Sequence, residues 1–295
     1  MSLDAVLAEQ SGVISRTQAL GAGLSRDSID HRVRARRWRP LHPSVYLAAG
    51  HRLDDEVRVR AALLWAGDGA ILSGRAAAWW CGLATEPPPA VVLTIPRLRR
   101  LRRRLDVDVR RRDVPELDRA VHRGLAVTAP ALTVLETAVA LGGAGPRFLD
   151  DALRRGAVSY AAVHAAYCRN LNSAGSATAG HMLAAAAGQS ASDARRKLHA
   201  LLRSSRASGW TDSLRIDGQV IDVAFPAARV AIVVSGWAGP AGPPRTKADA
   251  QLWQTLTARG WTLLHCTCQD LNERPRAVLA EIARHVTRGL APCDR

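Results

Sequence analysis

The sequence contains no run of 18 or more consecutive apolar residues, which excludes a membrane-spanning helix. Its first residues, Met1 to Asp4, have neither the basic stretch nor the apolar core of a secretory leader, so we expect a cytoplasmic protein. Five cysteines among 295 residues are too few, and odd in number, for a disulfide framework. Aromatic residues make up only 4%, which argues against binding of single-stranded nucleic acid by base stacking.

Lysine is almost missing as well. Lys197 and Lys247 are the only two, so arginine supplies nearly all of the positive charge in a chain of formal net charge +15. Arginine is the better bidentate partner for phosphate and guanine. Net charge informs about partners rather than fold, and here it favours a polyanion, without deciding between DNA and RNA.

Two segments hold most of the excess charge. Residues 26–39 contain six arginines against two aspartates, and residues 97–112 contain nine arginines against two aspartates. For the second segment, a solvated surface with no partner is an equally good interpretation. The first segment carries more structural information.

Its surroundings have the pattern of a helix-turn-helix. Residues 3–9 form a short amphipathic helix, and Ser15 with Gln18 predicts a capping box at the start of a second helix. A glycine turn follows, and Ser25 is a suitable N-cap for a third helix over 26–36. We expect the buried stripe of this third helix to be formed by Ile29 and Val33 next to Leu24, with the basic side chains opposite.

Short extended pieces at 38–41 and 44–47 complete the shape of a winged helix-turn-helix. A helix fits the major groove of duplex DNA, while basic residues of a wing reach phosphates or the minor groove. The alternative is a small helical domain with a solvated basic face. The predicted DNA-binding residues are Arg16, Ser25, Arg26, His31, Arg32, Arg34, Arg36, Arg37 and Arg39. Among them, Arg26, His31 and Arg34 are expected at base edges. Asp27 and Asp30, on the same helix, could repel DNA phosphates or bases when the protein lies in a wrong register, or accept a hydrogen bond from cytosine.

The chain also resembles a known family. The segments 12–20, 23–25 and 37–46 (the last reading Arg-Trp-Arg-Pro-Leu-His-Pro-Ser-Val-Tyr) are similar to the N-terminal winged helix of AbiEi-type antitoxins, and the similarity continues through 72–83 and 127–135. The resemblance implies a DNA-binding autorepressor of a bacterial toxin–antitoxin operon. It also implies a nucleotidyltransferase-like toxin as partner. Palindromic half-sites would call for two copies of the chain, as a homodimer or bound cooperatively.

The remaining pattern predicts an α/β (α+β) protein. Helices are expected at 52–66, 73–83, 128–141 and 148–155, and strands at 91–95 and 106–110. The Ala-, Gly- and Ser-rich stretch 170–192 is expected to be a linker at a domain boundary. The predicted domains are a winged helix with following helices over 1–85, an antitoxin-like middle region with linker over 86–180, and a restriction-endonuclease-like domain over 181–295.

For that last domain, the expected elements in chain order are helix 193–206, strands 214–216, 219–225 and 229–235, helix 247–259, strand 261–267 and helix 275–288. This αβββαβα order is typical of the restriction-endonuclease-like core. Residues 220–226 and 229–237, with Asp249 and Gly260-Trp261, resemble very-short-patch-repair-like endonuclease domains. Asp217-Gly218 is a hairpin signal.

The catalytic residues of such a nuclease are largely missing. The resemblance places Asp222 at the first metal-binding carboxylate, but the acids of the next strand fall on Val233 and Ser235, and the usual histidine falls in Gly239-Pro240. The acid usual on the first helix is replaced near Arg195. One carboxylate binds Mg²⁺ too weakly to activate water, although Asp193 and Asp249 could in principle contribute. We therefore expect no enzyme activity, no metal and no cofactor, and a retained scaffold that binds nucleic acid or the partner, with Arg245 and Lys247 on its rim.

Two other functions stay open: a divergent DNA endonuclease guided by the winged helix, and a general nucleic-acid-binding protein. Asp222 could instead pair with Lys197, Arg215 or another arginine. The remaining signals favour structural roles. Cys266 and Cys268 are expected as core thiols on one strand, and the tryptophans 65, 79 and 80 as core. His42 is expected either at phosphate or packed on Trp38. No Walker or Rossmann glycine loop is present.

Overall fold

The computed structural model describes residues 2–102, 104–205, 207–216, 219–236 and 247–290, with the backbone alone at 219 and 247–252. It is an α+β protein, as expected from the sequence. Contacts divide the chain into two compact units, Met1–Gly180 and His181–Arg295. No helix among the described residues is both long enough and apolar enough to cross a membrane.

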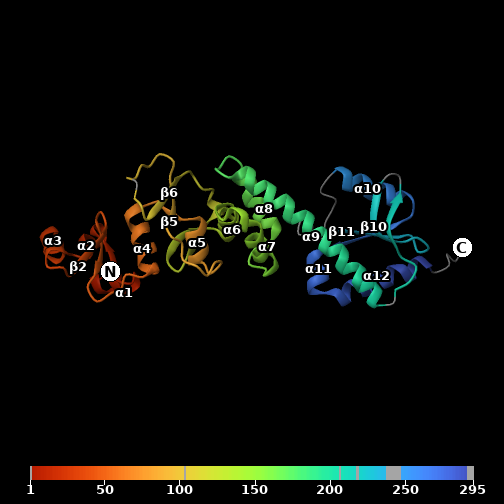
Figure 1. Cartoon of the computed structure of the whole chain (residues 1–295), viewed down its shortest axis with the longest axis horizontal. Helices are drawn as coiled ribbons and strands as arrows, with labels where there is room; N and C mark the ends of the chain where they lie inside the picture. The colour runs from red at the N-terminus through yellow and green to blue at the C-terminus, as the bar shows by residue number, and fades with distance from the viewer. Residues whose placement is uncertain (1, 103, 206, 217–218, 237–246, 291–295) are drawn as a thin grey trace. The chain divides into compact units, whose positions relative to one another are not determined.

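The first unit begins with a winged helix. Its elements are α1 (Leu3–Glu9), β1 (Val13–Ser15), α2 (Arg16–Gly21), α3 (Arg26–Arg34), β2 (Trp38–His42) and β3 (Val45–Ala48) (Figure 1). The three strands form an antiparallel sheet in the order β1-β3-β2. Strand β1 is not apparent from the sequence, because three residues are too few to show the alternation of a strand. Helix α3 ends at Arg34, two residues earlier than expected.

The winged helix has its own small hydrophobic core, and the other face of its sheet packs against a helix. Ile14, Ile29 and Trp38 are buried in one cluster, and Leu24 and Val33 pack against it, as the predicted stripe requires. The other face of the sheet packs on α4 (Asp55–Ala66) through a second cluster that includes Val45 and Val57. Because all four residues of β3 are buried, the wing is held from both sides.

The rest of the first unit is built on a five-stranded sheet in the order β6-β5-β4-β8-β7. The strands are β4 (Ile71–Leu72), β5 (Val91–Ile95), β6 (Val107–Arg111), β7 (Arg119–His122) and β8 (Leu125–Thr128). The helices are α4, α5 (Gly74–Trp80), α6 (Pro130–Ala140), α7 (Gly145–Arg154) and α8 (Tyr160–Arg169). Short 3-10 turns lie at Glu116–Asp118 and Gly142–Ala144. Strands β4, β7 and β8 and helix α8 are additions to the elements expected from the sequence.

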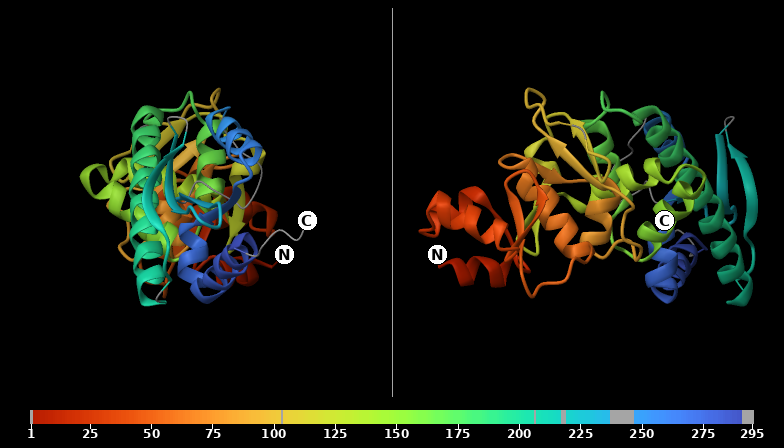
Figure 2. Two further views of the ribbon diagram at one scale, coloured as in Figure 1. Left: turned by 90° about the vertical axis from the view of Figure 1, so that its right-hand side faces the viewer. Right: turned by 60° about the vertical axis from the view of Figure 1, so that its left-hand side comes forward.

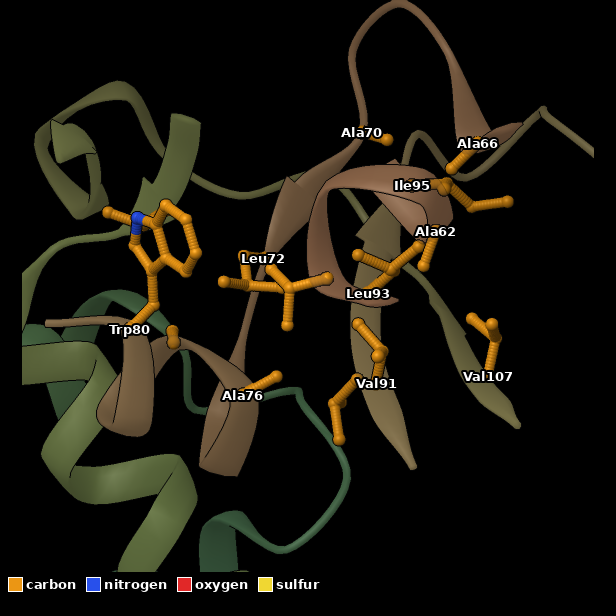
Figure 3. Packing of buried hydrophobic residues seen from close by; sticks show 14 residues of the cluster. Ala62, Ala66, Ala70, Leu72, Ala76, Trp80, Val91, Leu93, Ile95 and Val107 are labelled. Atoms are coloured by element: carbon orange, nitrogen blue, oxygen red, sulfur yellow. The ribbon is translucent and has the colours of Figure 1, made fainter. Parts of the chain in front are cut away.

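The core of this sheet is formed by small and branched side chains. Leu72, Leu93 and Trp80 are almost completely buried in one cluster, with alanines of α4 and α5 around them (Figure 3). This sheet joins strands from both sides of residue 85. The parallel pairing of β5 with β6 leaves the arginine-rich segment 97–106 as the connection between them.

The stretch 170–192 does contain the boundary between the two units, after Gly180, but the prediction that it is a linker is wrong. Most of it belongs to α9 (Ser176–Ser204), a helix of 29 residues. Alanine has the highest helix propensity of all residues, and it is abundant enough at 177–194 to outweigh two glycines. Met182 and Leu183 of this helix are buried, so the segment is packed against other parts of the protein rather than surrounded by solvent.

The second unit contains the second half of α9, followed by β9 (Thr211–Ile216), β10 (Gln219–Phe225), β11 (Val230–Ser235), α10 (Lys247–Ala258), β12 (Thr262–Thr267), α11 (Cys268–Glu273) and α12 (Pro275–Leu290). The sheet order is β12-β11-β10-β9, with β11 and β12 parallel and the other pairs antiparallel. Leu198 and Leu202 of α9 pack on Val223 and Ile232 of the sheet. Figure 2 shows α9 running alongside this sheet. The expected element order is confirmed, with α11 added.

Candidate nucleic-acid interface

The turn between α2 and α3 follows from two capping motifs. Ser15 accepts from the backbone N–H of Gln18, while Gln18 accepts from the N–H of Ser15, which closes the predicted capping box. Helix α2 ends in a Schellman motif with Gly23 in the left-handed region, at φ +91°. The Ser25 side chain accepts from the N–H of Ser28 and starts α3. Ser25 therefore has a structural role in the free protein as the N-cap of the candidate recognition helix.

Arg26 lies at the first position of α3 and is exposed. The N-terminus of a helix carries a partial positive charge, so a cation there loses a few tenths to about 1 kcal/mol rather than gaining it. Arg26 has no hydrogen bond or ion pair within the described part of the chain. Local structure thus gives no reason for an arginine at this position, whereas an external anion does.

Arg36 is a second arginine at a position where this residue type lowers the stability of the protein. Helix α3 ends, like α2, in a Schellman motif, in which the N–H of Arg36 donates to Val33 and that of Arg37 donates to Arg32. Arg36 occupies the left-handed position at φ +55°, where glycine is preferred. Strained backbone positions of this kind concentrate at functional sites.

The two arginines in the last turn of α3 form hydrogen bonds within that helix, which gives them a partly structural role. Arg32 donates from Nη1 to the carbonyl of Ser28 at 3.1 Å, and its guanidinium lies 5.8 Å from the Trp38 ring centre. Arg34 donates from Nε to the carbonyl of Asp30 at 3.4 Å and is otherwise exposed. Basic residues also suit the C-terminal end of a helix. The remaining predicted contacts are exposed, and their side chains have no hydrogen bond or ion pair among the described residues; they are His31, Arg37 and Arg39.

Arg16 differs from the other predicted contacts. Its guanidinium makes a two-pronged ion pair with Asp30, with Nη1–Oδ1 and Nη2–Oδ2 distances of 2.8 and 3.1 Å, and also donates to the Tyr46 hydroxyl at 3.3 Å. The pair lowers the pKa of Asp30 and raises that of Arg16, first through these hydrogen bonds. Arg16 thus ties α2 to α3 and to β3. Both oxygens of Asp30 accept from Arg16, which balances its negative charge.

His42 packs inside the protein, on a different tryptophan from the one expected. It is buried and stacked on Trp65, with ring centres 5.4 Å apart, and its Nε2 is 3.9 Å from Asp106 Oδ2. Burial lowers the pKa of His42, against the smaller raising effect of Asp106. The histidine is therefore part of the packing beneath the wing.

The tryptophans expected in the core are buried to different degrees. Trp80 is nearly inaccessible, and the guanidinium groups of Arg60 and Arg123 lie over its ring. Trp65 and Trp79 are half-buried and pack against the same core cluster. All three contribute to the packing of the first unit.

The second arginine-rich segment is partly engaged within the protein. Arg99 donates to the carbonyl of Asp68, and the Arg104 guanidinium lies 5.9 Å from the Trp65 ring centre. Arg112 forms an ion pair with Glu136 and donates to Asn170 Oδ1 at 3.0 Å. Leu98 and Leu105 in the same connection are fully exposed.

In the second unit, Asp222 has a partner that accounts for its charge. Its Oδ1 accepts from Arg195, and its Oδ2 accepts from the backbone N–H of Val234 at 2.7 Å. Lys197 instead donates to Asn272, so it is not the partner of Asp222. No group of three His, Cys, Asp or Glu residues within the described ranges could hold a metal ion.

Several expected features fall outside the described residues: Asp217-Gly218, Gly239-Pro240, Arg245, and the side chains of Lys247 and Asp249. Cys266 and Cys268 are both buried, but Cys268 begins α11 rather than continuing the strand. Burial raises the pKa of the Cys266 thiol to about 12, which fits a core thiol.

The Arg16–Asp30 and Arg195–Asp222 pairs are the main features that the sequence does not reveal. Each joins residues more than ten positions apart on different elements, so no local spacing rule could have found them.

Comparison with known proteins adds one distant likeness. No family model matches this chain, and no curated protein matches it either. The crystal structure of the RV2827C protein from Mycobacterium tuberculosis is similar over 61% of this chain and 74% of that chain, with 18% sequence identity and a TM-score of 0.42. A likeness this distant carries no functional argument.

Proposed function

We propose that the protein is a sequence-specific DNA-binding repressor that uses its winged helix-turn-helix. One observation carries the proposal: exposed arginines without carboxylate partners lie together on α3, in the turn after it and on the wing. Two of them, Arg26 and Arg36, occupy positions where an arginine lowers the stability of the free protein. A protein gains from such residues when they meet an anion. Phosphate and guanine are the anionic and acceptor groups that arginine binds best.

The residues divide into roles by where they lie. Arg26, His31 and Arg34 on the exposed side of α3 would face base edges in the major groove. Arg36, Arg37 and Arg39, in the turn and on β2, would contact phosphate or the adjacent minor groove. Arg16 would act through Asp30, by fixing α3 against α2.

We further propose that the protein is an antitoxin that represses its own operon and counters a nucleotidyltransferase-like toxin. The resemblance of residues 12–20 and 37–46 to AbiEi-type antitoxins supports this part of the proposal. Two copies on a palindromic operator would follow from the symmetry of such sites. Copurification with the nucleotidyltransferase-like product of an adjacent gene tests the partner directly.

For the second unit, we propose binding rather than cleavage. The ion pair of Asp222 with Arg195 supports this interpretation, because the guanidinium already supplies the positive charge that a metal ion would bring to this carboxylate. A magnesium-dependent nicking assay is the test. Cleavage that disappears in Asp222→Ala would reject the proposal for this unit and leave the DNA-reading proposal standing.

The main experiment is fluorescence anisotropy at about 150 mM salt, where non-specific binding is weak. The full chain is titrated against its own upstream DNA and against a scrambled duplex of equal length. We expect a preference of about a thousandfold or more for the upstream DNA. The Arg26→Ala/Arg34→Ala variant should lose most of that preference.

A matched control removes the same charge elsewhere. Arg147 and Arg155 are exposed on α7 and at its end, and Arg147→Ala/Arg155→Ala should keep the preference. Equal binding of both duplexes by the unmodified chain would overturn the proposal and leave only a basic surface. Equal losses in the two double variants would show that charge, and not α3, is responsible.

A further inference from the structure

A cavity of about 530 Å³ lies within the first unit, away from the winged helix. It is bounded by the end of β6, one face of α6, the segment after α8 and the first turn of α9. Its volume falls in the range of cavities that hold small organic molecules. The DNA-binding proposal makes no use of it.

One wall of the cavity is a closed polar network. Arg112 forms an ion pair with Glu136, whose side chain is only 9% exposed, and donates to Asn170. The second carboxylate oxygen of Glu136 accepts from the N–H of Gly74 at 2.9 Å. Both oxygens of Glu136 are thus engaged, and its charge is balanced by Arg112.

Arg110 adds a positive charge that this network does not balance. It lies two residues before Arg112 in the chain and also lines the cavity, and a Cβ placed on Gly74 would be 3.7 Å from its Nη1. The side chains of Arg110 and of Arg111, which also lines the cavity, have no hydrogen bond or ion pair within the described part of the chain. The N-terminus of the long helix α9 adds a partial positive charge from Ser176. The cavity therefore favours an anion.

The rest of the lining is largely aliphatic. Leu132, Leu135 and Val139 follow one another at helical spacing along the same helix, α6, that carries Glu136, and Ala179 of α9 also lines the cavity. A cavity lined by both arginines and aliphatic side chains suits an amphipathic ligand rather than a free inorganic ion.

We propose that this cavity binds a small organic anion, with its carboxylate or phosphate group on Arg110 and its apolar body against α6. The proposal goes beyond DNA binding and does not depend on it. Isothermal titration calorimetry of the full chain with three probes of one shape tests it: 1-naphthoate, 1-naphthyl phosphate and neutral 1-naphthamide. The two anions distinguish a carboxylate ligand from a phosphate ligand.

We expect at least one anion to bind at least tenfold more tightly than the amide. Arg110→Gln should remove that advantage and leave amide binding unchanged, whereas Arg147→Gln on α7, which lies outside the cavity lining, should have no effect. Ala174 lines the cavity and is exposed, so Ala174→Trp should block all three probes without disturbing the core.

Three results would each overturn the proposal. They are the absence of binding by both anions, equal binding of the amide, and anion binding that survives in Arg110→Gln. If Arg110→Gln fails to fold, as judged by circular dichroism, the comparison of anions with amide and the Ala174→Trp variant still decide the matter.

Discussion

The two arginine-rich segments of this protein differ in what their arginines contact. In residues 26–39, most guanidinium groups are exposed, and Arg26 and Arg36 occupy positions that an arginine makes less stable. In residues 97–112, Arg99, Arg104 and Arg112 each have a partner inside the protein. In the second segment Arg104 and Arg112 are paired with carboxylates, whereas the described arginines of 26–39 form no ion pair.

This difference shows that a count of arginines does not reveal which of them are free to bind an external anion. What separates the two segments is the set of partners that their guanidinium groups have, which depends on contacts between distant parts of the chain. Removal of Arg112 should therefore alter stability, whereas removal of the exposed arginines of 26–39 should alter binding of DNA if the proposed function is right.

The largest effect is expected at Arg112. Arg112→Ala would leave Glu136 as an uncompensated, nearly buried charge, and removing one partner of such a pair costs about 3–5 kcal/mol. Urea unfolding of the full chain measures the change. Arg111→Ala, next to it and without a partner among the described residues, should cost less than about 0.5 kcal/mol. Similar losses in the free energy of unfolding for the two variants would contradict the distinction between arginines with and without a side-chain partner in the protein.

A smaller effect is expected on DNA affinity. If Arg37 and Arg39 each contact a phosphate, Arg37→Ala/Arg39→Ala should reduce the slope of log K against log salt by about 2. The same double change at Arg100 and Arg102, in the second segment, should leave the slope unchanged. Anisotropy titrations between about 50 and 200 mM salt provide both slopes. Equal changes in slope would mean that both segments contact DNA.

The two Schellman motifs allow a matched test of backbone strain. Arg36→Gly relieves a left-handed arginine and should raise the free energy of unfolding by about 0.5–1 kcal/mol, while Gly23→Ala should lower it by a similar amount. No neighbouring atom lies within 4 Å of a Cβ added at Gly23, so the backbone conformation alone is tested there. If Arg36 contacts DNA, Arg36→Gly should bind DNA more weakly although it is more stable. A loss of stability in Arg36→Gly would contradict this account.

The smallest effect concerns pH. The hydrogen bonds of Arg16 hold the pKa of Asp30 below its ordinary value of 3.8. Such a carboxylate contributes stability at pH values above the unfolded pKa, and this contribution is lost as the pH falls through the folded pKa. The stability difference between the unmodified chain and Asp30→Asn should therefore be present at about pH 6 and shrink below about pH 4. Thermal unfolding across this range measures it, and a constant difference would show that the ion pair does not form in solution.

Much of the fold follows from local patterns. The caps at Ser15 and Ser25, the glycine turn and the stripe at Ile29 predict the helix-turn-helix, because each depends on residues a few positions apart. The strands that the sequence does not reveal are short or paired with distant partners: β4 has two residues and is defined by pairing with β5 and β8. At 170–192, small residues indicate a linker by composition, but the helix propensity of alanine outweighs that indication.

The sequence by itself determined where the positive charge is concentrated, the helix-turn-helix pattern with its caps at Ser15 and Ser25, and the order of the elements after residue 193 up to α10 and β12. The tertiary structure decided which charges are balanced. It paired Arg16 with Asp30, Arg112 with Glu136 and Arg195 with Asp222. The physical reason is that charge balance acts over a few ångströms in space, and residues far apart in sequence come within that range only when the chain has folded.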